Sequence, residues 1–129
     1  MNDTKTDSLA SVAPLNAGRF EVALVEARAL ALRGELALRD PVAEVGPHFR
    51  ALHDAAAGGG EVVVDVTELR FVNSSGLRVF LDWVAWIAGE PAPRQYRLRF
   101  RTKRGVTWQA AAFPAIAMMG GAHVTLETV

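Results

Sequence analysis

Apolar and polar residues alternate through the early part of the chain, a pattern typical of strands. The even-numbered positions of residues 20–24 are all apolar, and leucine occupies most even-numbered positions of residues 30–38. We therefore predict two strands, over residues 20–26 and 29–38. Gly34 interrupts the second pattern and indicates a bulge or a bend at that point.

Helical and strand patterns then take turns. A Gly-Pro pair at residues 46–47 predicts a helix start, and three consecutive glycines at residues 58–60 predict its end. Residues 61–66 are nearly all apolar and rich in β-branched side chains, which is typical of a central strand buried on both faces. We expect residues 67–72 to form a loop.

Two more helices and two more strands complete the pattern. Helical spacing covers residues 74–88 and 106–119, and Pro114 is expected to kink or split the second helix. Residues 95–101 alternate cleanly, and residues 123–127 form a plausible last strand. The predicted order is β-β-α-β-α-β-α-β. It indicates the α/β class, with a single domain built on a mixed β-sheet covered by helices.

Length and composition fit one folded domain. The chain has 129 residues, of which 50% are hydrophobic, so it can bury a core. Residues 1–18 are polar and interrupted by Pro14 and Gly18, and we predict a flexible tail there, with the domain over residues 19–129. The first residues do not resemble a signal peptide, and no apolar run is long enough for a membrane span. We expect a cytoplasmic protein that does not associate with membranes.

Charge and residue types exclude several kinds of chemistry. The 14 basic and 14 acidic residues cancel, so no net field attracts nucleic acid. Without cysteine the chain has no disulfide, thiolate metal site or cysteine nucleophile. His48 and His53 are five positions apart and do not share a helix face as zinc ligands do, so we predict no metal and no cofactor. Ser74, His123 and Asp65 could form a hydrolase triad only on paper, because Gly-x-Ser-x-Gly is absent, and we predict no enzyme activity.

A basic run occupies residues 94–104 without an acidic residue. The usual meaning of such a run is a solvated strand face. An acidic partner is an alternative, and nucleic acid is disfavoured because no exposed aromatic residues are interleaved with the basic ones.

The most informative segment is residues 62–77. A hydrophobic strand ends in Asp65, the apolar pair of residues 71–72 follows, and Asn73-Ser74-Ser75-Gly76 opens a helix. This arrangement resembles the STAS domain, the fold of the anti-sigma factor antagonists, whose motif usually has Asp at the position of Asn73.

The resemblance implies a bacterial regulator that acts by partner switching. In that family a serine kinase, often also an anti-sigma factor, phosphorylates the first serine of the motif, and a PP2C-type phosphatase restores binding. Carried over, the acceptor is Ser74, with Ser75 as the alternative. The family match implies a signal-transduction phosphoprotein that works through protein–protein interaction.

The local physics fits a switch. Asn73 or Ser74 can cap the helix, and the amides around Gly76 and Leu77 can hold an anion. A phosphate there gains about 0.3–1 kcal/mol from the helix dipole and adds about −1.5 to −2 charges.

The predicted helix also has two apolar sides. At about 100° per residue, one stripe runs from Leu77 to Ala88, and Val79, Trp83 and Trp86 lie nearly opposite it. These three side chains are either core residues or a partner-binding patch beside Ser74. Three functions remain open: a phosphorylated switch, an adaptor or homodimerising subunit without phosphorylation, and a module that binds a lipid or nucleotide.

Overall fold

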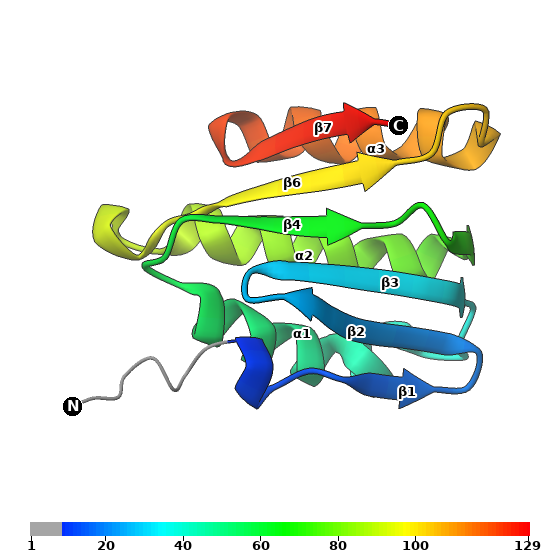
Figure 1. Ribbon diagram of the computed structural model, residues 1–129, viewed down its shortest axis with the longest axis horizontal. Helices are drawn as coiled ribbons and strands as arrows, with labels where there is room; N and C mark the ends of the chain where they lie inside the picture. Colours follow the sequence, from blue (N-terminus) through cyan, green and yellow to red (C-terminus); the bar gives the residue numbers. More distant parts are fainter. Residues whose placement is uncertain (1–8) are drawn as a thin grey trace.

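The strands form one mixed sheet that is covered by helices on a single face (Figure 1). The computed structural model describes residues 9–129. The sheet has seven strands in the order β1-β2-β3-β4-β6-β7, and β5 pairs with β3. Their bounds are β1 Leu15–Ala17, β2 Phe20–Glu26, β3 Ala29–Leu36, β4 Glu61–Asp65, β5 Leu69–Val72, β6 Arg97–Thr102 and β7 Val124–Thr128.

Three α-helices and three short 3₁₀ helices connect the strands. The α-helices are α1 Pro41–Ala56, α2 Ser74–Gly89 and α3 Thr107–Gly120. The short helices are η2 Leu9–Ser11, η3 Ala92–Arg94 and η4 Gly121–His123. The predicted α/β class and mixed sheet are confirmed: β1, β2 and β3 pair antiparallel, while β3, β4, β6 and β7 run parallel.

The sheet is open on its second face, which corrects the prediction for residues 61–66. In β4 the side chains of Val62 and Val64 are buried, whereas Glu61, Val63 and Asp65 are half-exposed. The helices all lie behind the sheet in Figure 1, so alternate side chains of each strand face solvent. A strand that is covered on one face usually alternates apolar and polar residues, and the consecutive valines of β4 do not show this alternation.

The open face also explains the basic run. Arg99 forms an ion pair with Glu61, and both Arg99 and Arg101 lie within 3.5 Å of Glu127. Arg101 additionally lies 3.9 Å from Asp65. The acidic partners come from neighbouring strands, so two arginines of the run that look unpaired in sequence are paired across the sheet.

Residues 67–72 contain a strand, not only a loop. β5 pairs in parallel with the end of β3, and the register shifts between Gly34 and Glu35. Gly34 has a φ of 89°, and a Cβ there would overlap the carbonyl of Arg19, so only glycine fits. The irregularity predicted at Gly34, a bulge or a bend, is present: the register with β5 shifts there, and the extra residue, Arg70, lies on β5. It turns β3 so that its end can pair with β5.

The two internal prolines lie inside helices, which corrects the helix start expected at Pro47 and the split expected at Pro114. α1 begins at Pro41, where Asp40 accepts a hydrogen bond from the amide of Ala43 and Glu44 accepts one from the amide of Asp40. Pro47 therefore lies inside α1. α3 likewise continues through Pro114 without a break. An interior proline costs about 3 kcal/mol, which burial of neighbouring side chains can offset.

Regular structure begins before the predicted domain boundary. Leu9 is fully buried in the hydrophobic core, and β1 pairs with β2. The described part of the domain therefore starts at Leu9, and η2 and β1 precede the boundary expected after residue 18. The flexible tail predicted for residues 1–8 lies outside the described residues.

Candidate partner-binding site

The serine motif lies at the exposed N-terminal end of α2. Asn73 is the N-cap, and its Oδ1 accepts a hydrogen bond of 2.7 Å from the amide of Gly76. Ser74 is the first residue of the helix, and both Ser74 and Ser75 are exposed. The structure thus brings the four predicted motif residues together, with both hydroxyl-bearing residues facing solvent.

Asn73 does more than cap the helix. Its Nδ2 donates to the carbonyl of Leu38 at 3.3 Å, and its amide donates to the carbonyl of Leu36 at 3.1 Å. An aspartate could replace the cap acceptor but not the side-chain donor. The Asn in place of the family's Asp therefore ties α2 to the segment that joins β3 to α1.

Gly76 is required by close packing. A Cβ at this position would lie 2.8 Å from Cγ1 of Val72, 3.0 Å from Oδ1 of Asn73 and 3.0 Å from the carbonyl oxygen of Leu36. Any side chain would push against the cap itself. The glycine of the motif thus allows the helix to start against the ends of β3 and β5.

The amides expected to hold an anion are already in use. The amide of Gly76 donates to the Asn73 side chain, and the amide of Leu77 donates to the Asn73 carbonyl at 3.1 Å. The expectation for these two groups is wrong, because the cap satisfies them. A phosphate on Ser74 would instead interact with the helix dipole.

Asp65, the strand aspartate of the motif, holds a turn. Its Oδ1 accepts hydrogen bonds from the amide of Thr67 at 2.8 Å and from the Thr67 hydroxyl at 2.6 Å. This Asx turn redirects the chain from β4 toward β5. Asp65 therefore sets the path of the segment that leads to Ser74.

Two of the three predicted partner-binding side chains are core residues. Val79 is 1% exposed and Trp83 is fully buried, while Trp86 is half-buried. The Trp83 ring packs against Phe49 of α1, with centroids 5.3 Å apart. The prediction of a patch is therefore corrected for Val79 and Trp83. α2 lies between α1 and α3 as well as on the sheet, so its buried arc is wider than that of a one-sided helix.

The indole and phenol groups of the core form a buried polar chain. Trp83 Nε1 donates to the Tyr96 hydroxyl at 2.7 Å, and that hydroxyl lies 2.9 Å from Nδ1 of His53. Nε2 of His53 lies 2.8 Å from Glu90, which also accepts from Arg94 at 3.0 Å. The chain links α1, α2 and the start of β6 at the end of α2 farthest from Ser74.

Two groups of this buried polar chain, Tyr96 and Glu90, have shifted pKa values. Burial raises the pKa of Tyr96, so its hydroxyl stays protonated. The hydrogen bonds from His53 and Arg94 lower the pKa of Glu90. In the tautomer of His53 that donates from Nε2 to the Glu90 carboxylate, Nδ1 accepts from the Tyr96 hydroxyl.

The same cluster contains the candidate metal ligands of the described residues. Donor atoms of His53, Asp54 and Glu90 lie within 4.8 Å of one another. His53 and Glu90 are already bonded within the polar chain, and Asp54 pairs with Arg50 at 3.5 Å. The arrangement is satisfied by protein groups, so we assign it a structural role.

Phe71, the first residue of the predicted apolar pair, is an exposed aromatic residue. Its side chain is 49% exposed, and it lies three positions before Ser74. In β5 the buried residues are Leu69 and Val72, which breaks the usual alternation because of the register shift at Gly34. The two-residue period of a strand predicts that one residue of the pair 71–72 is buried, but it does not indicate which one.

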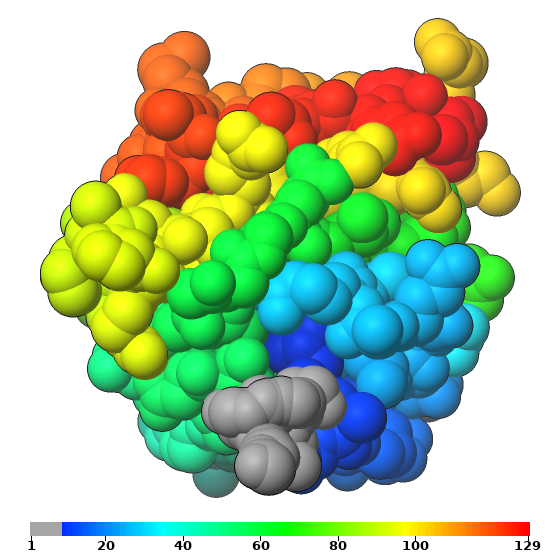
Figure 2. All heavy atoms as spheres, turned by 60° about the vertical axis from the view of Figure 1, so that its left-hand side comes forward, coloured from blue at the N-terminus to red at the C-terminus, as the bar shows by residue number. Residues whose placement is uncertain are grey.

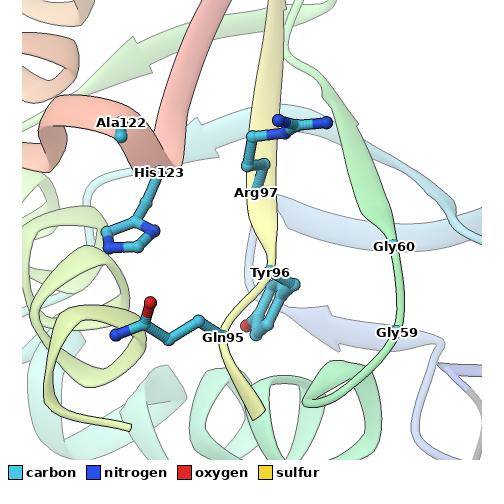
Figure 3. Close-up of a pocket in the computed structure, with 7 residues that line it drawn as sticks. All are labelled: Gly59, Gly60, Gln95, Tyr96, Arg97, Ala122 and His123. Atoms are coloured by element: carbon cyan, nitrogen blue, oxygen red, sulfur yellow. The ribbon is translucent and has the colours of Figure 1, made fainter. Parts of the chain in front are cut away.

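One pocket in the described part of the chain lies away from Ser74. It has a volume of about 350 Å³, and its lining includes Gly59, Gly60, Gln95, Tyr96, Arg97, Ala122 and His123 (Figure 3). The Gln95 amide is already bonded to the carbonyl of Glu90 at 2.9 Å. The pocket lies where β6 and β7 begin, opposite the strand ends at which open parallel sheets usually bind ligands.

The fold and the motif together define a STAS-like α/β domain. No protein-family model matches the sequence, and no curated protein matches it either. Two solved structures share the fold. One is the diguanylate cyclase SiaD in complex with its activator SiaC from Pseudomonas aeruginosa, with a TM-score of 0.66 at 13% identity over 91% of this chain and 99% of the matched chain.

The second structure is SiaC of Pseudomonas aeruginosa itself. It gives a TM-score of 0.65 at 14% identity over 91% of this chain and 98% of that chain. The likeness spans nearly the whole of both chains, and at this identity it establishes a shared fold. The STAS-like architecture predicted from residues 62–77 is thereby confirmed.

Within residues 9–129, α1, α2 and α3 all fall short of the length and apolar character needed to cross a membrane.

Proposed function

We propose that this protein is a regulatory module that binds a protein partner at the N-terminal end of α2, and that phosphorylation of Ser74 weakens this binding. The observation that carries the proposal is the exposure of Ser74 and Ser75 on a rigidly capped helix start. Phe71 stands beside them as an exposed aromatic anchor. Aromatic side chains of this kind often dominate the energy of an interface.

The electrostatics of the surface support the control step. Residues 71–77 carry no charged side chain, so a phosphate would add a negative charge to a segment that has none. Its −1.5 to −2 charges, roughly, would favour water over an apolar interface. The helix dipole contributes about 0.3–1 kcal/mol of stabilisation at an exposed site, so the fold can accept the modification. The same group therefore leaves the domain folded and opposes the partner.

The arrangement around Ser74 favours binding over catalysis. The Asp65 carboxylate accepts hydrogen bonds from Thr67. His123 lines the pocket at the start of β7, whereas Ser74 follows the end of β5. The three residues of the hypothetical hydrolase triad therefore lie in different parts of the fold. A serine without a neighbouring base is a poor nucleophile and a good acceptor for an external kinase.

The neighbours suggest a class of partner. SiaC is an activator found in complex with a diguanylate cyclase. We extend this to the present chain and propose a signalling enzyme of the diguanylate cyclase class as its binding partner. In this proposal a serine kinase and a PP2C-type phosphatase act on Ser74.

The control step can be tested with the kinase encoded nearest to this gene. The full chain, incubated with kinase and ATP, should gain the mass of one phosphate. Ser74→Ala should gain none, and Ser75→Ala should still gain one. A phosphate that persists in Ser74→Ala would show that the control residue is wrong.

The binding step can be tested with a cyclase encoded beside the gene. Phe71→Ala and phosphorylation of Ser74 should each weaken binding at least tenfold in calorimetry. Val25→Ala is a matched control, because Val25 is 50% exposed on β2. Equal loss in Phe71→Ala and Val25→Ala, or no loss in either, would place the interface elsewhere.

A further inference from the structure

The outer side of α3 and the free edge of β7 form one uncharged surface, which we call the α3–β7 edge. None of the 14 residues of α3 is charged. Met118 is 83% exposed, Met119 71%, and on β7 Leu126 is 37% exposed. The exposed positions of α3 are Thr107, Ala110, Ala111, Pro114, Ala115, Met118 and Met119.

β7 is an edge strand without the usual protection. Among the described strands it pairs with β6 alone, and α3 lies behind both of them (Figure 1). Edge strands are commonly blunted by lysine, proline, a bulge or short length. β7 has five residues, and its one charged side chain, Glu127, is bonded to Arg99 and Arg101 of its own sheet. By contrast β1, at the other edge, has three residues and is preceded by Pro14.

The free backbone groups of β7 can be assigned. Val129 donates to the carbonyl of Thr102 at 2.9 Å and accepts from the amide of Arg104 at 2.8 Å, so both of its groups point to β6 and the loop that follows it. Successive residues of a strand point to opposite sides, so Leu126 and Thr128 direct their amides and carbonyls to the open edge. The amide of Val124 is used by Gly121.

We propose that the α3–β7 edge binds a second copy of this chain, with the two β7 strands antiparallel and centred on Leu126. The two copies of Leu126 then exchange a pair of hydrogen bonds, as residues directly opposite each other in an antiparallel sheet do. Each Thr128 amide donates to the Val124 carbonyl of the second copy. This pairing therefore uses the backbone amides and carbonyls of β7 that point to the open edge of the sheet.

Charge supports a second copy as the occupant. A two-fold axis places like against like, so a self-associating face must avoid opposing equal charges. In this register Glu127 faces Thr125 of the second copy, and its carboxylate is held by Arg99 and Arg101 on its own sheet. The charge-free α3 helices come to lie side by side on the same face of the joined sheet, where small side chains permit close approach.

The shape of the surface agrees with this arrangement. Figure 2 shows the atoms of β7 and the C-terminal half of α3 together along the upper border of the molecule. Ser74 follows β5, which pairs with β3 on the other side of β4 and β6. Pairing through β7 therefore leaves the proposed partner-binding site of each copy open, and the two proposals can fail separately.

Sedimentation velocity on the full chain, from about 1 to about 100 µM, covers the range in which a micromolar dimer dissociates. We expect a species of twice the chain mass that grows with concentration. Thr128→Pro removes an amide that points to the open edge, together with the weak 3.4 Å contact between the hydroxyls of Thr128 and Thr102. Leu126→Lys places two like charges at the two-fold axis. Each should raise the dissociation constant at least tenfold, while Val25→Lys, on β2, should not change it.

Circular dichroism of each variant must show an unchanged fold for the comparison to count, and Thr128→Pro is chosen because an edge strand tolerates proline there. A wild-type chain that stays monomeric throughout this range overturns the proposal. So does a dimer that neither Thr128→Pro nor Leu126→Lys weakens, or one that Val25→Lys weakens equally. Weakening by Leu126→Lys alone overturns the strand pairing.

Discussion

The Tyr96 hydroxyl is the shared partner of two buried groups, and its removal has a large expected cost. Trp83 donates to it at 2.7 Å, and Nδ1 of His53 lies 2.9 Å away. Trp83 and His53 are fully buried, and Tyr96 is 4% exposed. Tyr96→Phe keeps the ring and removes the oxygen, so it leaves an indole donor and an imidazole acceptor without partners.

The magnitude follows from the two orphaned groups. A buried polar group that loses its partner costs about 1–3 kcal/mol, so the pair should cost about 2–5 kcal/mol in the free energy of unfolding. A domain of this size has a total stability of about 5–15 kcal/mol. We therefore expect Tyr96→Phe to fold, with a Tm lower by about 10 °C.

Urea denaturation followed by circular dichroism measures this change. Thr102→Val is the matched control, because it removes a buried hydroxyl of β6 that makes a weak 3.4 Å contact with the hydroxyl of Thr128. It should cost less than about 1 kcal/mol, since such a contact is weak. In a Trp83→Phe background the donor is already gone, so the cost of Tyr96→Phe should fall by about 1–3 kcal/mol.

The reasoning is refuted if Tyr96→Phe unfolds within about 0.5 kcal/mol of the wild type, the range of ordinary surface substitutions. It is also refuted if the double variant shows no coupling. Either result would mean that the three polar groups do not depend on one another.

Three further expectations concern the cap and the response to pH. Gly76→Ala should lower Tm and disturb the cap, because its Cβ would press on Asn73, whereas Gly89→Ala, which meets nothing within 4 Å, should be tolerated. Asn73→Ala should cost about 0.5–2 kcal/mol and Asn73→Asp less than about 1 kcal/mol, because aspartate keeps the cap, gains the dipole and loses only the bond to Leu38; equal losses in urea titrations would contradict this. Burial lowers the pKa of His48, so the unfolded state takes up protons first and Tm should fall as pH drops below 6.5. The lowered pKa of Glu90 should add a second loss as pH drops below 4.5, and Glu90→Gln should abolish only this part of the Tm profile.

The local order of the chain was accessible from its sequence, since it depends on neighbours. The start of α2 at Ser74 and its cap by Asn73 follow from short-range preferences, and the structure has both. The irregularity at Gly34 was predictable for the same reason. β5 was missed because its buried residues, Leu69 and Val72, are three apart, and only pairing with β3 explains that spacing.

The composition of the core depends on contacts that are distant in sequence. The buried arc of α2 is wider than the predicted core stripe: Phe80 and Val84 of that stripe are buried, but Val79 and Trp83 are buried too. A periodic pattern does not show how many neighbours a helix has. Trp83 meets Phe49 from α1 and Tyr96 from the segment before β6, at separations of 34 and 13 positions. Likewise, the acids that neutralise Arg99 come from β4 and β7, and no scan along one strand could find them.

The two ends of α2 are both held tightly, and this limits how the protein can report its state. At one end Asn73 is bonded to Leu36 and Leu38, and at the other the C-cap residue Glu90 is bonded to His53. A helix fixed in this way cannot swing when a group is added to Ser74. If Ser74 is phosphorylated as proposed, the two forms should therefore have nearly superimposable backbones, and they should differ in the charge of the surface and not in its shape. A binding partner that recognises the backbone shape alone would not distinguish the two forms.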